Sequence, residues 1–129
     1  PDKDWYRDEI EATSRLGINH IDFPMSSREL LDDERAKEII ALMRAAPKPL
    51  LIHCMGGADR SGLISALYLR YIADRPHVVA EGQLSLYFGH FAVPVLSKAY
   101  AMDVTWDNLP LDKTAMDTLL RSPVLAVAR

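Results

Sequence analysis

A short apolar run that leads through two glycines into an amphipathic helix constrains the fold of this chain most strongly. The apolar residues 50–52 are typical of a buried strand. Gly56 and Gly57 then allow a tight loop, and residues 60–73 place apolar side chains at helical spacing. Strand, loop and helix in this order belong to the units from which parallel sheets are built, so the segment predicts an α/β domain.

The rest of the chain is expected to supply the other layers of this domain. Residues 18–23 alternate in the manner of a strand, which places Ile18, His20 and Asp22 on one face and Asn19, Ile21 and Phe23 on the other, and Pro24 ends them. Apolar spacing and end signals predict helices over residues 4–16, from the acidic residues 32–34 to Pro47, and over 60–73, 78–87, 95–102 and 113–120. The fold class expected is a parallel central sheet flanked by helices. Two strands are too few for it, so a further strand is expected near residues 123–127 or upstream.

Size and composition predict one globular domain over residues 1–129, since 49% of the 129 residues are hydrophobic and 26% are charged. No apolar stretch approaches the roughly 20 residues of a membrane span. The first residues contain no apolar run, so no signal peptide is expected. The net charge of −3 disfavours binding to nucleic acid, which depends on Lys and Arg. Cys54 is the single cysteine, which excludes an intramolecular disulfide and indicates a reducing, cytoplasmic location.

The loop that follows residues 50–52 contains the groups that bind an oxyanion and activate a thiol. Its backbone N–H groups and the start of the next helix form an anion site. These dipoles and Arg60 favour the thiolate of Cys54, which is a strong nucleophile at neutral pH. The planar guanidinium of Arg60 matches two phosphate oxygens at once, and Ser61 can donate a hydrogen bond toward the sulfur. These residues together predict a site for a phosphate ester.

Residues 53–62 match the signature His-Cys-x-x-Gly-x-x-Arg-(Ser/Thr)-Gly, so the chain resembles the cysteine-dependent protein tyrosine and dual-specificity phosphatases. It is also similar to bacterial tyrosine-phosphatase-like proteins at residues 17–21 with the following Pro24, at 83–85 and at 87–90. The resemblance implies a parallel central sheet flanked by helices and hydrolysis of a phosphorylated protein or a small phosphomonoester. Relatives have further strands upstream of the first residue of this sequence.

The resemblance also implies a role for each residue of the loop. Cys54 attacks phosphorus to form a phosphocysteine, Arg60 holds the phosphate oxygens, and Ser61 helps the sulfur leave. His53 supports the thiolate from behind the loop. The residues implied in substrate binding are Met55, Gly56, Gly57, Ala58, Asp59 and Arg60. No metal or other cofactor is implied, and the four histidines are not spaced as metal ligands.

The general acid is the residue that the sequence leaves open. Relatives have an aspartate soon after the proline that ends the earlier strand, but serine follows Pro24 and Met25 here. Asp59 beside Arg60 is the first alternative, and some bacterial relatives use an aspartate there. Asp22 is the second. Asp32 and Asp33 are better explained as helix-capping residues.

The same residues are also compatible with other functions. A phosphatase of phosphoinositides or inositol phosphates is one, although Met55 and Ala58 stand where lipid-directed relatives often have lysine. A phosphate-binding module without turnover is another, which a missing general acid would favour and the pair Cys54 and Arg60 opposes. His90 either braces the loop or contacts substrate, and a hydrogen-bonded structural role is the commoner one for a histidine.

Overall fold

The computed structural model describes residues 3–92, 97, 99–109, 114 and 117–118. Every regular element bounded within them is helical. In chain order they are α1 (Asp4–Arg15), α2 (Asp33–Ala45), α3 (Asp59–Tyr71), α4 (His77–Glu81), the 3-10 helix η1 (Leu86–Phe88) and α5 (Tyr100–Asn108).

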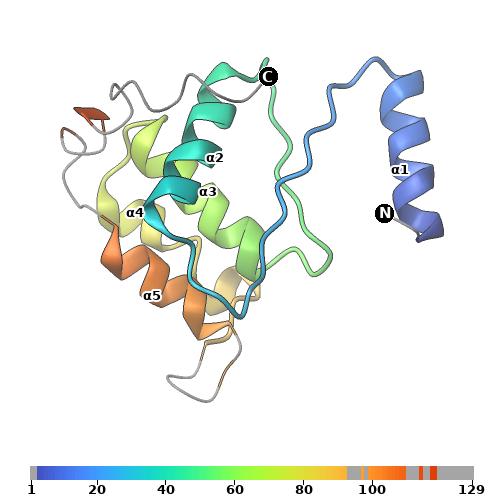
Figure 1. Cartoon of the computed structure of the whole chain (residues 1–129). Coiled ribbons are helices and arrows are strands. Elements are labelled where there is room, and N and C mark those ends of the chain that lie inside the picture. Colours follow the sequence, from blue (N-terminus) through green and yellow to red (C-terminus); the bar gives the residue numbers. More distant parts are fainter. Residues whose placement is uncertain (1–2, 93–96, 98, 110–113, 115–116, 119–129) are drawn as a thin grey trace.

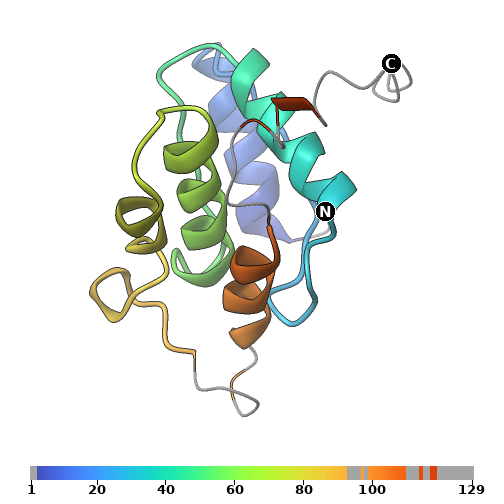
Figure 2. The same cartoon turned by 90° about the vertical axis from the view of Figure 1, so that its left-hand side faces the viewer.

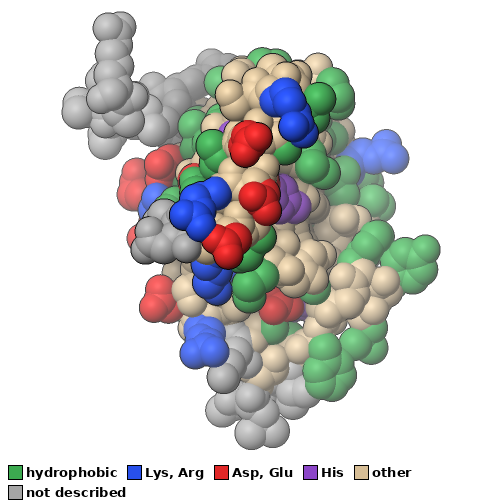
Figure 3. All heavy atoms as spheres, turned by 90° about the vertical axis from the view of Figure 1, so that its right-hand side faces the viewer, with side chains coloured by type: hydrophobic (Ala, Val, Ile, Leu, Met, Phe, Trp, Pro, Cys, Tyr) green, Lys and Arg blue, Asp and Glu red, His purple; other side chains and the backbone are tan. Residues whose placement is uncertain are grey.

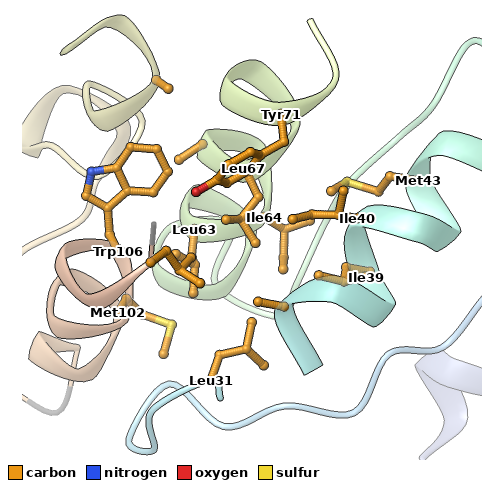
Figure 4. Close-up of a cluster of buried hydrophobic side chains, with 14 residues drawn as sticks. Leu31, Ile39, Ile40, Met43, Leu63, Ile64, Leu67, Tyr71, Met102 and Trp106 are labelled. Carbon is orange, nitrogen blue, oxygen red and sulfur yellow. The ribbon is translucent and has the colours of Figure 1, made fainter. Parts of the chain in front are cut away.

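The hydrophobic core forms around α3, which packs against α2, α4 and α5 (Figure 2). Its buried apolar side chains recur three and four residues apart, so they lie on one broad face of the helix. Side chains from α2 and α5 meet this face from opposite sides (Figure 4). Apart from alanines, the members of the core are Leu31, Ile39, Ile40, Met43, Leu63, Ile64, Leu67, Tyr71, Met102, Trp106 and Leu109.

The first three helices confirm the expected ones to within about two residues. The carboxylate of Asp32 caps α2 by accepting a hydrogen bond of 2.8 Å from the backbone N–H of Arg35. Asp33 and Glu34 lie in the first turn, where acidic side chains favour the positive end of the helix dipole. The capping role expected for Asp32 is therefore confirmed, whereas Asp33 is the first residue of the helix rather than its cap.

The second half of the chain differs from the expected helices. The helix expected over 78–87 is divided into α4 and η1, because α4 ends at Gly82 and Ser85 is extended. Instead of residues 95–102, α5 occupies Tyr100–Asn108, while 95, 96 and 98 lie outside the described residues. Of the helix expected over 113–120, only 114, 117 and 118 are described, and they are helical. The strand expected near 123–127 lies outside the described residues.

The expected parallel central sheet is wrong for the part of the chain that the structure describes, since no strand occurs there. Residues 18–23 and 50–52 run between helices without regular secondary structure and form no hydrogen-bonded ladder. A strand needs a partner for its backbone groups, and alternation within one segment does not supply one. Phe23, Leu50 and Ile52 pack against the helical core instead, whereas Leu51 between the last two is 84% exposed.

Helix α1 stands apart from the other helices (Figure 1) and contains no buried residue. On the face of the molecule that bears α1, acidic, basic and apolar side chains are mixed rather than gathered into a patch of one charge (Figure 3). None of the helices in the described ranges has the length and apolar character needed to cross a bilayer.

Candidate active site

The candidate active site lies where residues 53–58 connect the extended segment 50–52 to the first turn of α3 (Figure 1). Cys54 is half-buried at the start of this loop. Its Sγ lies 3.5 Å from the hydroxyl oxygen of the buried Ser61. The backbone N–H groups of Gly56, Gly57 and Ser61 also form hydrogen bonds to the sulfur. The loop and the helix start thus surround the sulfur with donors.

These donors change the acidity of the thiol. Burial raises the pKa of Cys54, but hydrogen bonds from the Ser61 hydroxyl and from the N–H groups of Ser61, Gly56 and Gly57 outweigh burial. The net result lowers the pKa from 9.0 to about 7. A large share of the cysteine is therefore thiolate at neutral pH, and the thiolate is the nucleophilic form.

Two glycines fix the shape of the loop and its place on the fold. Gly57 has a φ of +70°, which residues with a side chain rarely adopt. Gly62, in the first turn of α3, packs so closely that an added Cβ would lie 3.0 Å from the carbonyl oxygen of Gln83. The donors around Cys54 are thus held by the contact between α3 and the segment that follows α4.

The guanidinium of Arg60 is available for a ligand. Arg60 is half-buried in the first turn of α3. Among the described residues it has no hydrogen-bond or ion-pair partner. A guanidinium that binds an oxyanion through two parallel N–H bonds needs such an unoccupied fork.

Asp59 belongs to a chain of three ionisable side chains. Its Oδ1 lies 2.9 Å from Nδ1 of His90. Nε2 of His90 lies 3.2 Å from both carboxylate oxygens of Asp103, in the first turn of α5. His90 is 3% exposed, while the two aspartates are half-buried. The buried imidazole thus joins the start of α3 to the start of α5.

The alternative acid Asp22 has a different environment. It accepts a hydrogen bond from the hydroxyl of Tyr6, and one of its oxygens lies 3.2 Å from Nε2 of His20. The hydrogen bonds from Tyr6 and His20 lower the pKa of Asp22. The lower pKa favours the ionised form of this carboxyl group.

His53 contacts α1 rather than the loop. Its Nε2 lies 2.8 Å from a carboxylate oxygen of Glu9. The same oxygen lies 3.9 Å from Nδ1 of His20. The residue before Cys54 is thereby tied to a helix from the beginning of the chain.

Two of these contacts were not visible in the sequence. Asp103 and Glu9 stand in amphipathic helices among other acidic residues, and neither belongs to a local motif. Within the described residues, no group of three or more His, Cys, Asp and Glu side chains is arranged to hold a metal ion. The loop residues Met55 and Ala58 lie beside the glycines, with Met55 78% exposed.

Comparison with known proteins gives one result. Residues 7–88, more than half of the chain, match the model of a family described as the tyrosine phosphatase family. Neither curated protein sequences nor solved structures give a significant match. The matched range contains Cys54 to Ser61 and ends before His90 and Asp103.

Proposed function

This chain belongs to the tyrosine phosphatase family, and on that premise we propose that it hydrolyses phosphomonoesters through a phosphocysteine formed on Cys54. The proposed activity is that of a protein tyrosine or dual-specificity phosphatase, with residues 1–129 acting as one domain. The observation that supports it most directly is the position of the Cys54 sulfur. It lies among the donors of Ser61, Gly56 and Gly57, which lower its pKa to about 7.

In the proposed first step, the Cys54 thiolate attacks the phosphorus atom of the substrate. An S–P bond forms, and the bond between phosphorus and the leaving oxygen breaks. Asp59 gives its proton to that oxygen, so the leaving group departs as a neutral alcohol or phenol. Arg60 and the backbone N–H groups of residues 55–60 hold the other phosphate oxygens.

In the proposed second step, water attacks the phosphocysteine. An O–P bond forms, the S–P bond breaks, and the Asp59 carboxylate takes a proton from the water. The hydroxyl of Ser61, 3.5 Å from Sγ, stabilises the sulfur as it leaves with a negative charge. The thiolate, the protonated Asp59 and free phosphate are the products, so the enzyme returns to its starting state.

The nature of the nucleophile also bears on the compartment. A phosphocysteine forms only on a free thiol, and Cys54 has no second cysteine to pair with in this sequence. These points support a reducing compartment such as the cytoplasm. A phosphorylated protein or a small phosphomonoester is the proposed substrate.

Hydrolysis of 4-nitrophenyl phosphate in excess EDTA tests the proposal. The parent is expected to release phosphate, and Cys54→Ser is expected to abolish the release. Arg60→Lys keeps the charge but loses the planar fork, so kcat/KM should fall by about a hundredfold or more. Arg28→Lys is the matched control, because Arg28 is exposed and lies outside the loop. Turnover that persists in Cys54→Ser would refute a cysteine nucleophile. Phosphate or vanadate binding without turnover in the parent would point to a binding module.

A further inference from the structure

The histidine that follows η1 has an unusual pair of neighbours. Both ring nitrogens of His90 face carboxylate oxygens, from Asp59 at 2.9 Å and from Asp103 at 3.2 Å. A neutral imidazole has one N–H, whereas ionised carboxylates only accept. Two hydrogen bonds therefore need a second proton, on the imidazole or on one of the carboxyl groups.

Burial makes this arrangement rigid. The His90 side chain is 2% exposed, against 34% for Asp59 and 28% for Asp103. A buried imidazole loses much free energy when a nitrogen has no partner. His90 therefore keeps both contacts, and Asp103 sets the orientation of the ring in the way that a carboxylate orients an imidazole in catalytic triads.

The contact with His90 places the two carboxylate oxygens of Asp59 in different environments. Oδ1 is bound to His90, while among the described residues Oδ2 has no hydrogen-bond partner. The side chain is at the first position of α3, beside Arg60, and is partly open to solvent. Oδ2 is thus the oxygen left to exchange a proton with a ligand held by the loop.

We propose that His90, oriented by Asp103, is a positioning residue. It holds Oδ1 of Asp59 so that Oδ2 can give its proton to the leaving oxygen of the substrate. This inference rests on the proposed function. It adds two residues that lie beyond the matched range 7–88. His90 does not touch the substrate in this proposal and acts only through Asp59.

The test uses two substrates that differ in their need for an acid. Phenyl phosphate has a poor leaving group and needs protonation, whereas 4-nitrophenyl phosphate has a good one and needs little. If His90 acts through Asp59, His90→Ala should lower kcat/KM for phenyl phosphate, which reports the steps up to formation of the phosphocysteine, by about tenfold to a hundredfold, part of the about 10²–10⁴ that a general acid supplies. The kcat/KM for 4-nitrophenyl phosphate should change by less than about threefold, since formation of the phosphocysteine from this substrate makes little use of the acid.

Further variants separate positioning from folding. His90→Asn keeps a hydrogen-bonding group near the place of Nδ1 and should recover part of the loss. Asp103→Asn preserves the shape of the side chain and should lower the rate of cleavage of phenyl phosphate more than that of 4-nitrophenyl phosphate. In the double variant Asp59→Asn with His90→Ala, phenyl phosphate should be cleaved no more slowly than by Asp59→Asn alone. His77→Asn is the control, because His77 is half-buried against Trp106 and pairs with Glu81.

The outcomes are distinct. An equal fall in kcat/KM for the two substrates would overturn the positioning role and leave the proposed phosphatase activity intact. So would a fall in the double variant equal to the two single effects combined. No Cys54-dependent turnover in the parent would overturn both. If His90→Ala does not fold, as judged by its thermal unfolding, His90→Asn and Asp103→Asn decide the question on the same two substrates.

Discussion

Ser61 is the residue that most directly controls the charge on the Cys54 sulfur, since its hydroxyl and its N–H both lower the pKa of the thiol. Ser61→Ala removes the hydroxyl and should raise that pKa from about 7. A hydrogen bond to a charged acceptor contributes about 1.5 kcal/mol, so alkylation by iodoacetamide at pH 6 should slow about tenfold. At pH 9 the rate should change little. Ser65→Ala, on the same helix, is the control, and a rate lowered equally at both pH values would contradict the prediction.

The same residues show which parts of a site can be found in a sequence. Cys54, Arg60 and Ser61 are neighbours along the chain, and a loop of consecutive residues keeps its donors together however the rest of the chain folds. His90 contacts Asp59 across 31 positions and Asp103 across 13. No local pattern records such a contact, because burial of one imidazole between two helices depends on how the helices pack.

Among the elements, the contact between α3 and the segment after α4 holds the loop in place. In Gly62→Ala the new Cβ would lie 3.0 Å from the carbonyl oxygen of Gln83. Overpacking costs about 1–3 kcal/mol and alanine returns up to about 1 kcal/mol of helix propensity. We expect the free energy of unfolding, measured in urea, to fall by about 1 kcal/mol.

Gly56→Ala is the matched control for that substitution. A Cβ at Gly56 meets nothing within 4 Å, so the free energy of unfolding should stay within about 0.5 kcal/mol of the parent. An equal fall in the free energy of unfolding in the two variants would show that the carbonyl of Gln83 does not exclude a side chain at position 62.

Helix α1 is held by polar contacts, since it buries no residue and Glu9 lies 2.8 Å from His53. In Glu9→Gln the carboxylate partner of His53 is lost, so amide hydrogens of residues 4–15 should exchange faster. The global free energy of unfolding should change by less than about 1 kcal/mol, as is usual for a partly exposed ion pair. Glu11→Gln on the same helix is the control. Unchanged exchange in Glu9→Gln would mean that other contacts hold α1.

Helices and strands differ in how far their sequences predict them. The hydrogen bonds of α2 lie within the helix, and its cap, Asp32, is adjacent to it, so local signals identified both ends. Residues 18–23 have the alternation of a strand, but a sheet depends on a partner elsewhere in the chain. The spacing did not describe the faces of this segment, since Ile18 and Ile21 are both exposed while His20 and Phe23 are partly buried, and it could not specify pairing.

For the whole molecule, the acidity of Cys54 links stability to pH. The folded protein lowers the pKa of the thiol from 9.0 to about 7, so between these values the unfolded chain binds more protons than the folded one. The stabilisation is therefore absent below pH 7, grows as the pH rises, and is complete above pH 9. The free energy of unfolding of the parent minus that of Cys54→Ser should increase from pH 6 to pH 9. A difference that stays constant in urea titrations would contradict the lowered pKa.

The extended, unpaired segments affect how this protein behaves at high concentration. Residues 50–52 include Leu51, 84% exposed, and within the described chain they have no ladder to occupy their backbone N–H and C=O groups. Such a stretch is an open edge, and natural sheets protect their edges because a neighbouring molecule can add a strand there. A molecule that paired with residues 50–52 would lie beside Cys54, so it would obstruct the loop without disturbing the helical core.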